Sequence, residues 1–140
     1  MSRILGIDYG RARVGVSISD ELHLLAHPLE TISMKNNVVA RIGQLARDRQ
    51  VGKIVVGIPR KMSGELGPAA AEVSAFVEKL RAAVTCQVVT WDERLTTAAA
   101  QRSLHEAGKK THQSRKYIDQ VAAQMILQGY LDRSQTSAEK

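Results

Sequence analysis

Residues 3–19 read RILGIDYGRARVGVSIS, two short apolar runs separated by a polar turn that contains a glycine. The runs are Ile4–Ile7 and Val14–Ile18, and both are rich in β-branched residues. Apolar runs of this kind on either side of such a turn are typical of a β-hairpin. This stretch therefore predicts the first two strands of a sheet.

Asp8 comes at the end of the first run. Alternation along a strand places its side chain on the same face as Ile4 and Gly6. A buried carboxylate costs several kcal/mol unless its charge is compensated, and a bound cation, Arg11, Arg13 or backbone donors of the turn are possible compensators. A simple turn-capping role fits the hairpin equally well, because aspartate is a common turn residue.

The composition predicts one globular domain over residues 1–133, followed by a disordered tail at 134–140. The chain has 140 residues, of which 44% are hydrophobic, enough for a core without disulfides or structural metal. Its net charge of +6 favours a polyanionic partner, most commonly nucleic acid, although an ordinary basic surface is the alternative. Aromatic residues make up only 4%, so platforms for base stacking are not expected.

Cys86 is the only cysteine, so it has no disulfide partner in the chain, and its apolar neighbours make it a core residue rather than a nucleophile. No stretch approaches the roughly 20 apolar residues of a membrane span, and the N-terminus lacks a secretory signal. We expect a cytoplasmic protein with no membrane partner. The sequence leaves the oligomeric state open.

The rest of the chain alternates between short apolar runs and helical spacing. The predicted elements after the hairpin are strands at His27–Ile32, Lys53–Pro59 and Gln87–Trp91 and helices at Asn37–Arg49, Ala69–Ala83, Thr96–Ala107 and Tyr117–Leu131. This order, βββαβαβαα, predicts an α/β fold with a mixed five-stranded sheet flanked by helices. The first three strands form a meander, and the later strands run parallel to the first.

Acidic residues lie where ligands of α/β folds gather, at the carboxyl ends of parallel strands. Asp8 ends the first strand, and Asp92 and Glu93 follow the fifth. Alternation puts Glu93 on the face of Trp91 and Asp92 on the opposite face, so only one of the two can point at Asp8. Asp119 adds a carboxylate in the first turn of the last predicted helix, where stabilisation by the helix dipole is the alternative explanation.

Carboxylates that converge on one point repel each other unless cations hold them. Mg²⁺ and Mn²⁺ accept oxygen ligands and bridge to phosphates, and two ions about 4 Å apart can activate water and stabilise the leaving oxygen of a phosphodiester. The acids and the basic charge together predict a metal-dependent phosphodiesterase site. In this hypothesis Asp8, Asp119 and one of the adjacent pair Asp92 and Glu93 hold the ions.

Basic residues flank these acids and are candidates for phosphate contacts, which position a nucleic acid without reading its sequence. The candidate nucleic-acid-binding residues are Arg11, Arg13, Lys61, Arg94, Lys109, Lys110, Arg115 and Lys116. The last four belong to a polar loop predicted at residues 108–116. A solvated loop is the alternative for these four, and a surface ion pair or the orientation of Glu93 is the alternative for Arg94.

Other site chemistries are excluded by spacing. The histidines lack zinc-ligand spacing, and the glycines match neither the phosphate-loop motif nor the dinucleotide fingerprint.

Four motifs together resemble the YqgF family, also described as Holliday-junction-resolvase-like proteins and pre-16S rRNA nucleases of the RNase H-like superfamily. The motifs are GIDYG…RVGVSISD at 6–20, IVVGIP with a following GxxGP at 54–68, DERLTT at 92–97 and IDQVAA…ILQGYL at 118–131. The resemblance implies an RNase H-like fold and a metal-dependent nuclease that processes the 5′ end of precursor 16S rRNA. The metal ligands that it implies fall on Asp8, Glu93 and Asp119.

Some residues depart from the family pattern. Lys61 replaces an amide and Ser63 an acid in the loop after the fourth strand, and Gln120 replaces a small residue after the last acid. These departures leave the details of the substrate open.

Several functions stay open beside processing of precursor rRNA. They are resolution of branched DNA, a non-catalytic nucleic-acid-binding role in ribosome assembly, and an actin-like ATPase, which would need a second such domain. The choice of metal and of endo- or exonucleolytic action also stays open.

Overall fold

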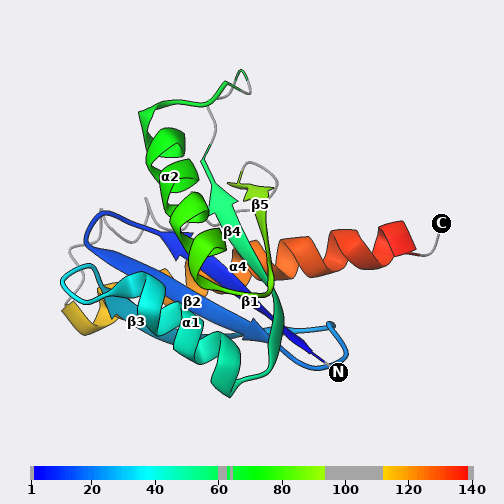
Figure 1. Ribbon diagram of the computed structural model, residues 1–140. Coiled ribbons are helices and arrows are strands. Elements are labelled where there is room, and N and C mark those ends of the chain that lie inside the picture. The colour runs from blue at the N-terminus through cyan, green and yellow to red at the C-terminus, as the bar shows by residue number, and fades with distance from the viewer. Residues whose placement is uncertain (1, 60–62, 64, 94–111, 139–140) are drawn as a thin grey trace.

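The computed structural model describes residues 2–59, 63, 65–93 and 112–138 (Figure 1). The strands are β1 (Arg3–Tyr9), β2 (Arg13–Ser19), β3 (Ala26–Ser33), β4 (Val51–Ile58) and β5 (Gln87–Asp92). The helices are α1 (Val38–Asp48), α2 (Pro68–Ala83) and α4 (His112–Ala138). Within the described ranges, no helix has both the length and the hydrophobicity that a membrane span requires.

The predicted mixed five-stranded sheet is confirmed, with the strand order β3-β2-β1-β4-β5. β1, β2 and β3 form an antiparallel meander, and β4 and β5 run parallel to β1. Pro28 lies on the edge strand β3, where its missing N–H costs no ladder hydrogen bond. The β2–β3 register shifts beside Pro28, so Leu29 is an extra residue of β3, as in a β-bulge.

Helices cover both faces of the sheet, α1 and α2 on one face and α4 on the other (Figure 1). Side chains of β5 show how strand alternation divides the core. Val88 packs in the cluster with α1 and α2, whereas Val89 and Trp91 pack with α4. By the same alternation, the side chain of Glu93 lies on the α4 face of the sheet and that of Asp92 on the opposite face, as predicted.

Helix α4 differs from the prediction at both ends. It begins at His112, inside the segment predicted as a loop, and the predicted end at Leu131 is wrong because the helix continues to Ala138 through residues predicted as a tail. Both extensions are polar and lack the apolar spacing that marks a helix, but neither contains Gly or Pro to stop one. The helix predicted at Thr96–Ala107 lies outside the described residues.

Helix α4 approaches the sheet closely because glycines replace side chains beneath it. A Cβ atom on Gly6 would lie only 2.6 Å from the Cβ of Leu127 and 2.5 Å from the hydroxyl of Ser17. The Ser17 hydroxyl donates to the carbonyl of Ala123 at 2.8 Å, so the helix backbone is hydrogen-bonded directly to β2. Such an approach leaves no room for a larger residue at Gly6.

The same close packing recurs at the carboxyl end of β1. A Cβ atom on Gly15 would collide with the carbonyl oxygen of Asp119, and one on Gly57 would lie 2.5 Å from the Cδ1 of Ile126. Gly15 and Gly57 therefore fix the distance of α4 from β2 and β4.

Helix α1 is tied to the edge strand β3 by a two-pronged ion pair. Arg41 donates from Nε and Nη2 to the two carboxylate oxygens of Glu30 at 2.8 and 2.6 Å. This bidentate geometry is the strongest that an Arg–carboxylate pair adopts. The hydrogen-bonded guanidinium holds the pKa of Glu30 below its ordinary value.

We expect Glu30→Gln to lower the free energy of unfolding by about 1 kcal/mol at neutral pH, because a partly exposed ion pair contributes about that much. A carboxylate with a depressed folded-state pKa stabilises the protein above its ordinary pKa and loses this effect as the pH falls through the folded value. The difference between the variant and the wild type should therefore shrink in acid. Urea unfolding across the acid range measures it, and in an Arg41→Gln background the substitution should have little effect.

We expect Gly15→Ala to lower the free energy of unfolding by about 3 kcal/mol or more, because the new methyl group collides with backbone that cannot move alone. Gly43→Ala in α1 is the matched control, since its Cβ atom would meet no atom closer than 3.5 Å. Removing a glycine from a helix interior should raise stability by about 1 kcal/mol. Equal effects of the two substitutions in urea unfolding would contradict this account of the α4 contact.

Candidate active site

A row of three residues crosses the sheet at the carboxyl end of β1. Asp8 on β1 pairs with Gly15 on β2. On the other side the parallel register runs through Ile7 and Val56, so the next residue of β4, Gly57, lies beside Asp8. All three positions face α4, and the only side chain among them is the carboxylate of Asp8.

Asp8 is buried, with 3% of its surface exposed, inside the strand rather than in the turn. The turn itself is closed by the backbone, since the Gly10 N–H donates to the carbonyl of Arg13. Asp8 therefore lies in the strand, before the turn, and the turn-capping role that the sequence left open stays an alternative.

Asp119 lies directly above Gly15. Its backbone carbonyl faces the Cα of that glycine, and its carboxylate accepts a hydrogen bond from Arg13 Nε at 2.7 Å. The side chain of Asp119 is 14% exposed and that of Arg13 is 25% exposed, so the ion pair is largely shielded from water. Because α4 begins at His112, Asp119 lies well beyond the first turn, and the helix dipole no longer explains an acid there.

Glu93 follows β5 immediately and is 5% exposed. Its Cγ atom lies 3.1 Å from the position that a Cβ atom of Gly57 would occupy. The side chain therefore extends from β5 over β4, into space that the glycine leaves open, and towards the strand that carries Asp8.

The three predicted acids thus lie on one face and at one end of the sheet. Asp119 covers Gly15, Glu93 covers Gly57, and Asp8 stands between these two glycines, which are two strand spacings or about 10 Å apart. Among the described residues, however, no group of three or more His, Cys, Asp or Glu side chains is arranged to hold a metal ion as it stands. The Arg13 ion pair is one physical reason, because it draws the carboxylate of Asp119 to β2.

The donor set fits a hard divalent cation in its chemistry. Three carboxylates from β1, the end of β5 and α4 offer only oxygen ligands, the type that Mg²⁺ and Mn²⁺ prefer. Their burial under α4 would make such a cation an effective partner, since buried negative charge needs compensation. A change in the Asp119 side chain would be needed for the three to share one ion.

The predicted nucleic-acid-binding residues are only partly described. Arg11 lies in the turn after Asp8, with a side chain that is 85% exposed and 3.7 Å from Glu72 of α2. Arg13 forms an ion pair with Asp119, and its predicted contact with nucleic acid stays a prediction. Lys61, Arg94, Lys109 and Lys110 lie outside the described residues, and only the helical backbone is described at Arg115 and Lys116.

Cys86 is half-buried against the core cluster with α1 and α2, where burial raises the pKa of its thiol. A raised pKa keeps the thiol protonated at neutral pH, which suits a packing role rather than a nucleophile.

Sequence reasoning missed two features of this site. The contact between Arg13 and Asp119 spans 106 positions and leaves no local signal. Gly15 and Gly57 did carry a local sequence signal for the second feature, the close approach of α4, because an isolated glycine within a strand often marks the close approach of another backbone.

Comparison with known proteins matches the chain to one family model and to curated relatives over most of its length. The family model for RuvX, described as Holliday junction resolvase, matches residues 2–133. A protein of Moorella thermoacetica is 48% identical over 133 residues, covering 94% of this chain and 95% of its own, and one of Acetivibrio thermocellus is 42% identical over 134 residues, covering 93% and 95%. Both are named "Putative pre-16S rRNA nuclease".

Solved structures are similar in fold. The T. thermophilus RuvC in complex with Holliday junction substrate has a TM-score of 0.59 at 15% identity over 96% of both chains, and the free Thermus thermophilus RuvC has a TM-score of 0.57. At this identity the likeness establishes the fold alone, and it confirms the predicted RNase H-like architecture. Since the family model covers nearly the whole chain, the protein belongs to the RuvX family, which is the YqgF family that its four motifs resemble.

Proposed function

We propose that this protein is a nuclease that hydrolyses phosphodiester bonds in structured nucleic acid, with Mg²⁺ or Mn²⁺ held by Asp8, Glu93 and Asp119. The observation that carries the proposal is the row Gly15–Asp8–Gly57, over which the other two acids lie. Family membership supports the same activity, because the family and its relatives are named for nucleases.

Precursor 16S rRNA is the substrate that we propose, on the strength of the relatives' names. Branched DNA is the second candidate, because the family description names Holliday junctions. If precursor rRNA is the substrate, the protein acts in the cytoplasm.

The chemistry of the site follows from where its side chains lie. Two divalent ions, when bound, would activate water and stabilise the leaving oxygen of the phosphodiester. Asp8 is the central ligand because it stands between the other two acids, and α4 excludes bulk water from that side. Arg11, exposed at the turn beyond Asp8, is placed to hold a backbone phosphate of the substrate.

In this proposal Arg13 competes with the divalent ion for the carboxylate of Asp119. A guanidinium and a divalent ion that share one carboxylate repel each other, and two unit charges 4 Å apart already interact by about 4 kcal/mol at an effective dielectric constant of 20. The opposite effect, loss of a hydrogen bond that orients a metal ligand, typically costs about 10–100-fold in affinity, or about 1.4–2.7 kcal/mol. Repulsion is the larger of the two, so Arg13 weakens metal binding and holds Asp119 in place until a cation arrives.

We expect Asp8→Asn to reduce Mn²⁺-dependent cleavage by roughly a thousandfold or more while nucleic-acid binding persists, because the central ligand loses its charge but not its shape. Cleavage of a precursor 16S rRNA fragment and of a four-way DNA junction, by wild type and variant side by side, measures both activity and substrate choice. Glu72→Gln, at a half-exposed carboxylate of α2 on the opposite face of the sheet from α4, is the control and should keep cleavage near the wild-type rate.

Retained cleavage by a clean preparation of the Asp8→Asn variant would overturn the assignment. If the wild type cleaves the four-way junction in preference to the rRNA fragment, the nuclease activity is supported and branched DNA becomes its substrate.

We expect Arg13→Gln to bind Mn²⁺ about tenfold more tightly than the wild type, because a competing positive charge is removed from Asp119. Isothermal titration calorimetry measures the affinity without any substrate. Arg11→Gln removes the same charge two residues earlier, from the turn before β2, without touching Asp119 and should change the affinity by no more than about twofold.

Equal or weaker binding by Arg13→Gln would refute the competition and leave the nuclease proposal standing. If neither protein binds Mn²⁺ at millimolar concentration, the metal-dependent mechanism fails, and a non-catalytic nucleic-acid-binding role gains support.

A further inference from the structure

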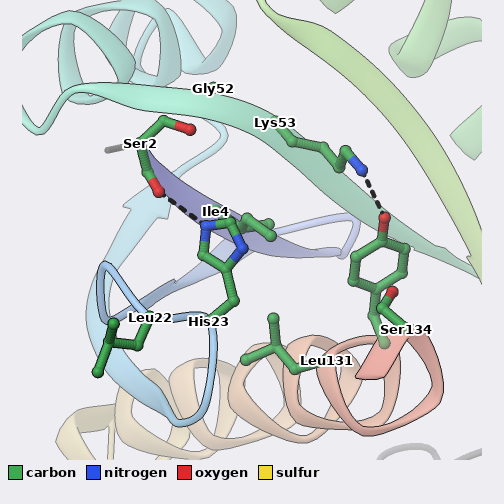
Figure 2. Close-up of a pocket in the computed structure, with 9 residues that line it drawn as sticks. Ser2, Ile4, Leu22, His23, Gly52, Lys53, Leu131 and Ser134 are labelled. Carbon is green, nitrogen blue, oxygen red and sulfur yellow. Dashed lines mark hydrogen bonds between the residues drawn. The ribbon is translucent and has the colours of Figure 1, made fainter. Parts of the chain in front are cut away.

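A cavity of about 330 Å³ lies at the other end of β1 from the acids (Figure 2). Ile4, at its floor, is four residues from Asp8 along the strand, or about 13 Å at 3.3 Å per residue. The walls come from β4, from the last part of α4 and from the loop between β2 and β3. The contact of α4 with Gly6 separates this cavity from the candidate active site.

One wall of the cavity carries a cation held in a fixed position. The ammonium group of Lys53 donates to the hydroxyl of Tyr130 at 2.7 Å, and its Nζ lies 5.3 Å from the centre of the Tyr130 ring (Figure 2). An ammonium has three donors, so this hydrogen bond leaves donors for a ligand. The Tyr130 oxygen accepts from Lys53 and keeps its own proton to donate.

The cavity lining favours an anion. None of the residues that line it is acidic, and in the described part of the chain Lys53 forms no ion pair with a carboxylate. The hydroxyl groups of Ser2 and Ser134 add further donors at the rim. Hydrogen-bond donors around a single ammonium, without a competing carboxylate, are the usual surroundings of a bound phosphate.

The opposite wall is held in shape by the loop between β2 and β3. His23 adopts a left-handed backbone conformation, with φ of 59°, and its Nε2 donates to the carbonyl of Ser2 at 2.7 Å (Figure 2). The carboxylate of Asp20 accepts from the backbone N–H groups of Leu24 and Leu25, which closes the loop. These contacts fix the loop, so this wall of the cavity is formed before any ligand binds.

Apolar surface completes the cavity. Ile4 and Leu131 are buried at its floor, and Leu22, which is 65% exposed, stands at its mouth. A volume of this size lies at the lower end of the roughly 300–1,000 Å³ that small-molecule sites occupy. It suits a ligand with one anionic group and a small, partly apolar body rather than a nucleic-acid duplex.

We propose that this cavity binds a phosphate monoester, with a nucleoside monophosphate as the representative ligand. Lys53 and Tyr130 hold the phosphate, and Leu22 and Leu131 contact the nucleoside. The ligand is either a free nucleotide or the phosphorylated end of a nucleic-acid strand, which present the same chemistry. The site is separate from the acids of the candidate active site, so it does not depend on the proposed nuclease activity.

Titration of the full-length protein with adenosine 5′-monophosphate, followed by ¹H–¹⁵N NMR, tests the proposal. We expect shifts at Lys53, Tyr130 and His23 that saturate in the millimolar range or below, and no comparable shifts with adenosine. Lys53→Met keeps the aliphatic stem and should weaken binding by about tenfold or more. Lys79→Met, which removes an exposed lysine of α2, is the control and should leave the affinity within about twofold.

A second variant guards against a fold defect in Lys53→Met. Ser134→Asp puts a negative charge at the exposed rim, where no packing is disturbed, and should also abolish binding of the nucleotide. Unchanged affinity in both variants, or shifts confined to Asp8 and its neighbours, would overturn the proposal, as would no binding at millimolar concentration.

Short oligonucleotides identify the source of the phosphate. A 5′-phosphorylated trinucleotide that binds more tightly than both its 5′-hydroxyl form and adenosine 5′-monophosphate would support the end of a strand. Tighter binding of the monophosphate would support a free nucleotide. Equal binding of the phosphorylated and 5′-hydroxyl trinucleotides, together with no binding of the monophosphate, would refute a phosphate site.

Discussion

The close contact of α4 with three glycines on one face of the sheet is the constraint on which the rest of the structure depends. Side chains at Gly6, Gly15 and Gly57 would all collide with the helix or with side chains that it carries. Their absence lets the helix backbone accept a hydrogen bond from Ser17 of β2, an arrangement that ordinary side-chain packing would prevent. It also sets the position of Asp119 above Gly15 and leaves room above Gly57 for Glu93. The same three glycines therefore determine both how the helix packs on the sheet and where the acids lie.

Such a site costs stability, and the fold offsets part of that cost. Buried carboxylates at one end of the sheet lose hydration, so they weaken the folded state unless positive charge is near. Arg13 supplies one such charge, in an ion pair that is mostly shielded from water. A hydrophobic residue at Asp119 would pack against β2 with less penalty. Retaining an acid where packing alone would favour an apolar residue is typical of a functional site rather than of a stabilising device.

The sequence predicted what depends on local pattern. Strand alternation is a local property, so the faces of Asp8, Glu93 and Asp92 followed from their neighbours, and the order of runs and helices gave the sheet. The start and end of α4 could not be predicted, because its polar ends lack apolar spacing and are helical only by continuation from the packed centre. The Arg13–Asp119 pair was equally out of reach, since nothing near either residue indicates the other. The basic residues predicted to contact nucleic acid lie mostly outside the described structure and stay predictions.

Likeness of fold does not by itself assign chemistry, and at 15% identity the resolvase structures support the architecture only. The acids are what distinguish the site. The sequence allowed a separate, local explanation for two of them, a turn cap at Asp8 and a helix dipole at Asp119. Asp8 lies in a strand, before the turn, and Asp119 lies about two turns into its helix. Asp119 has the Arg13 ion pair as a local partner, and the cation that we propose is the one partner that would account for all three acids on this face.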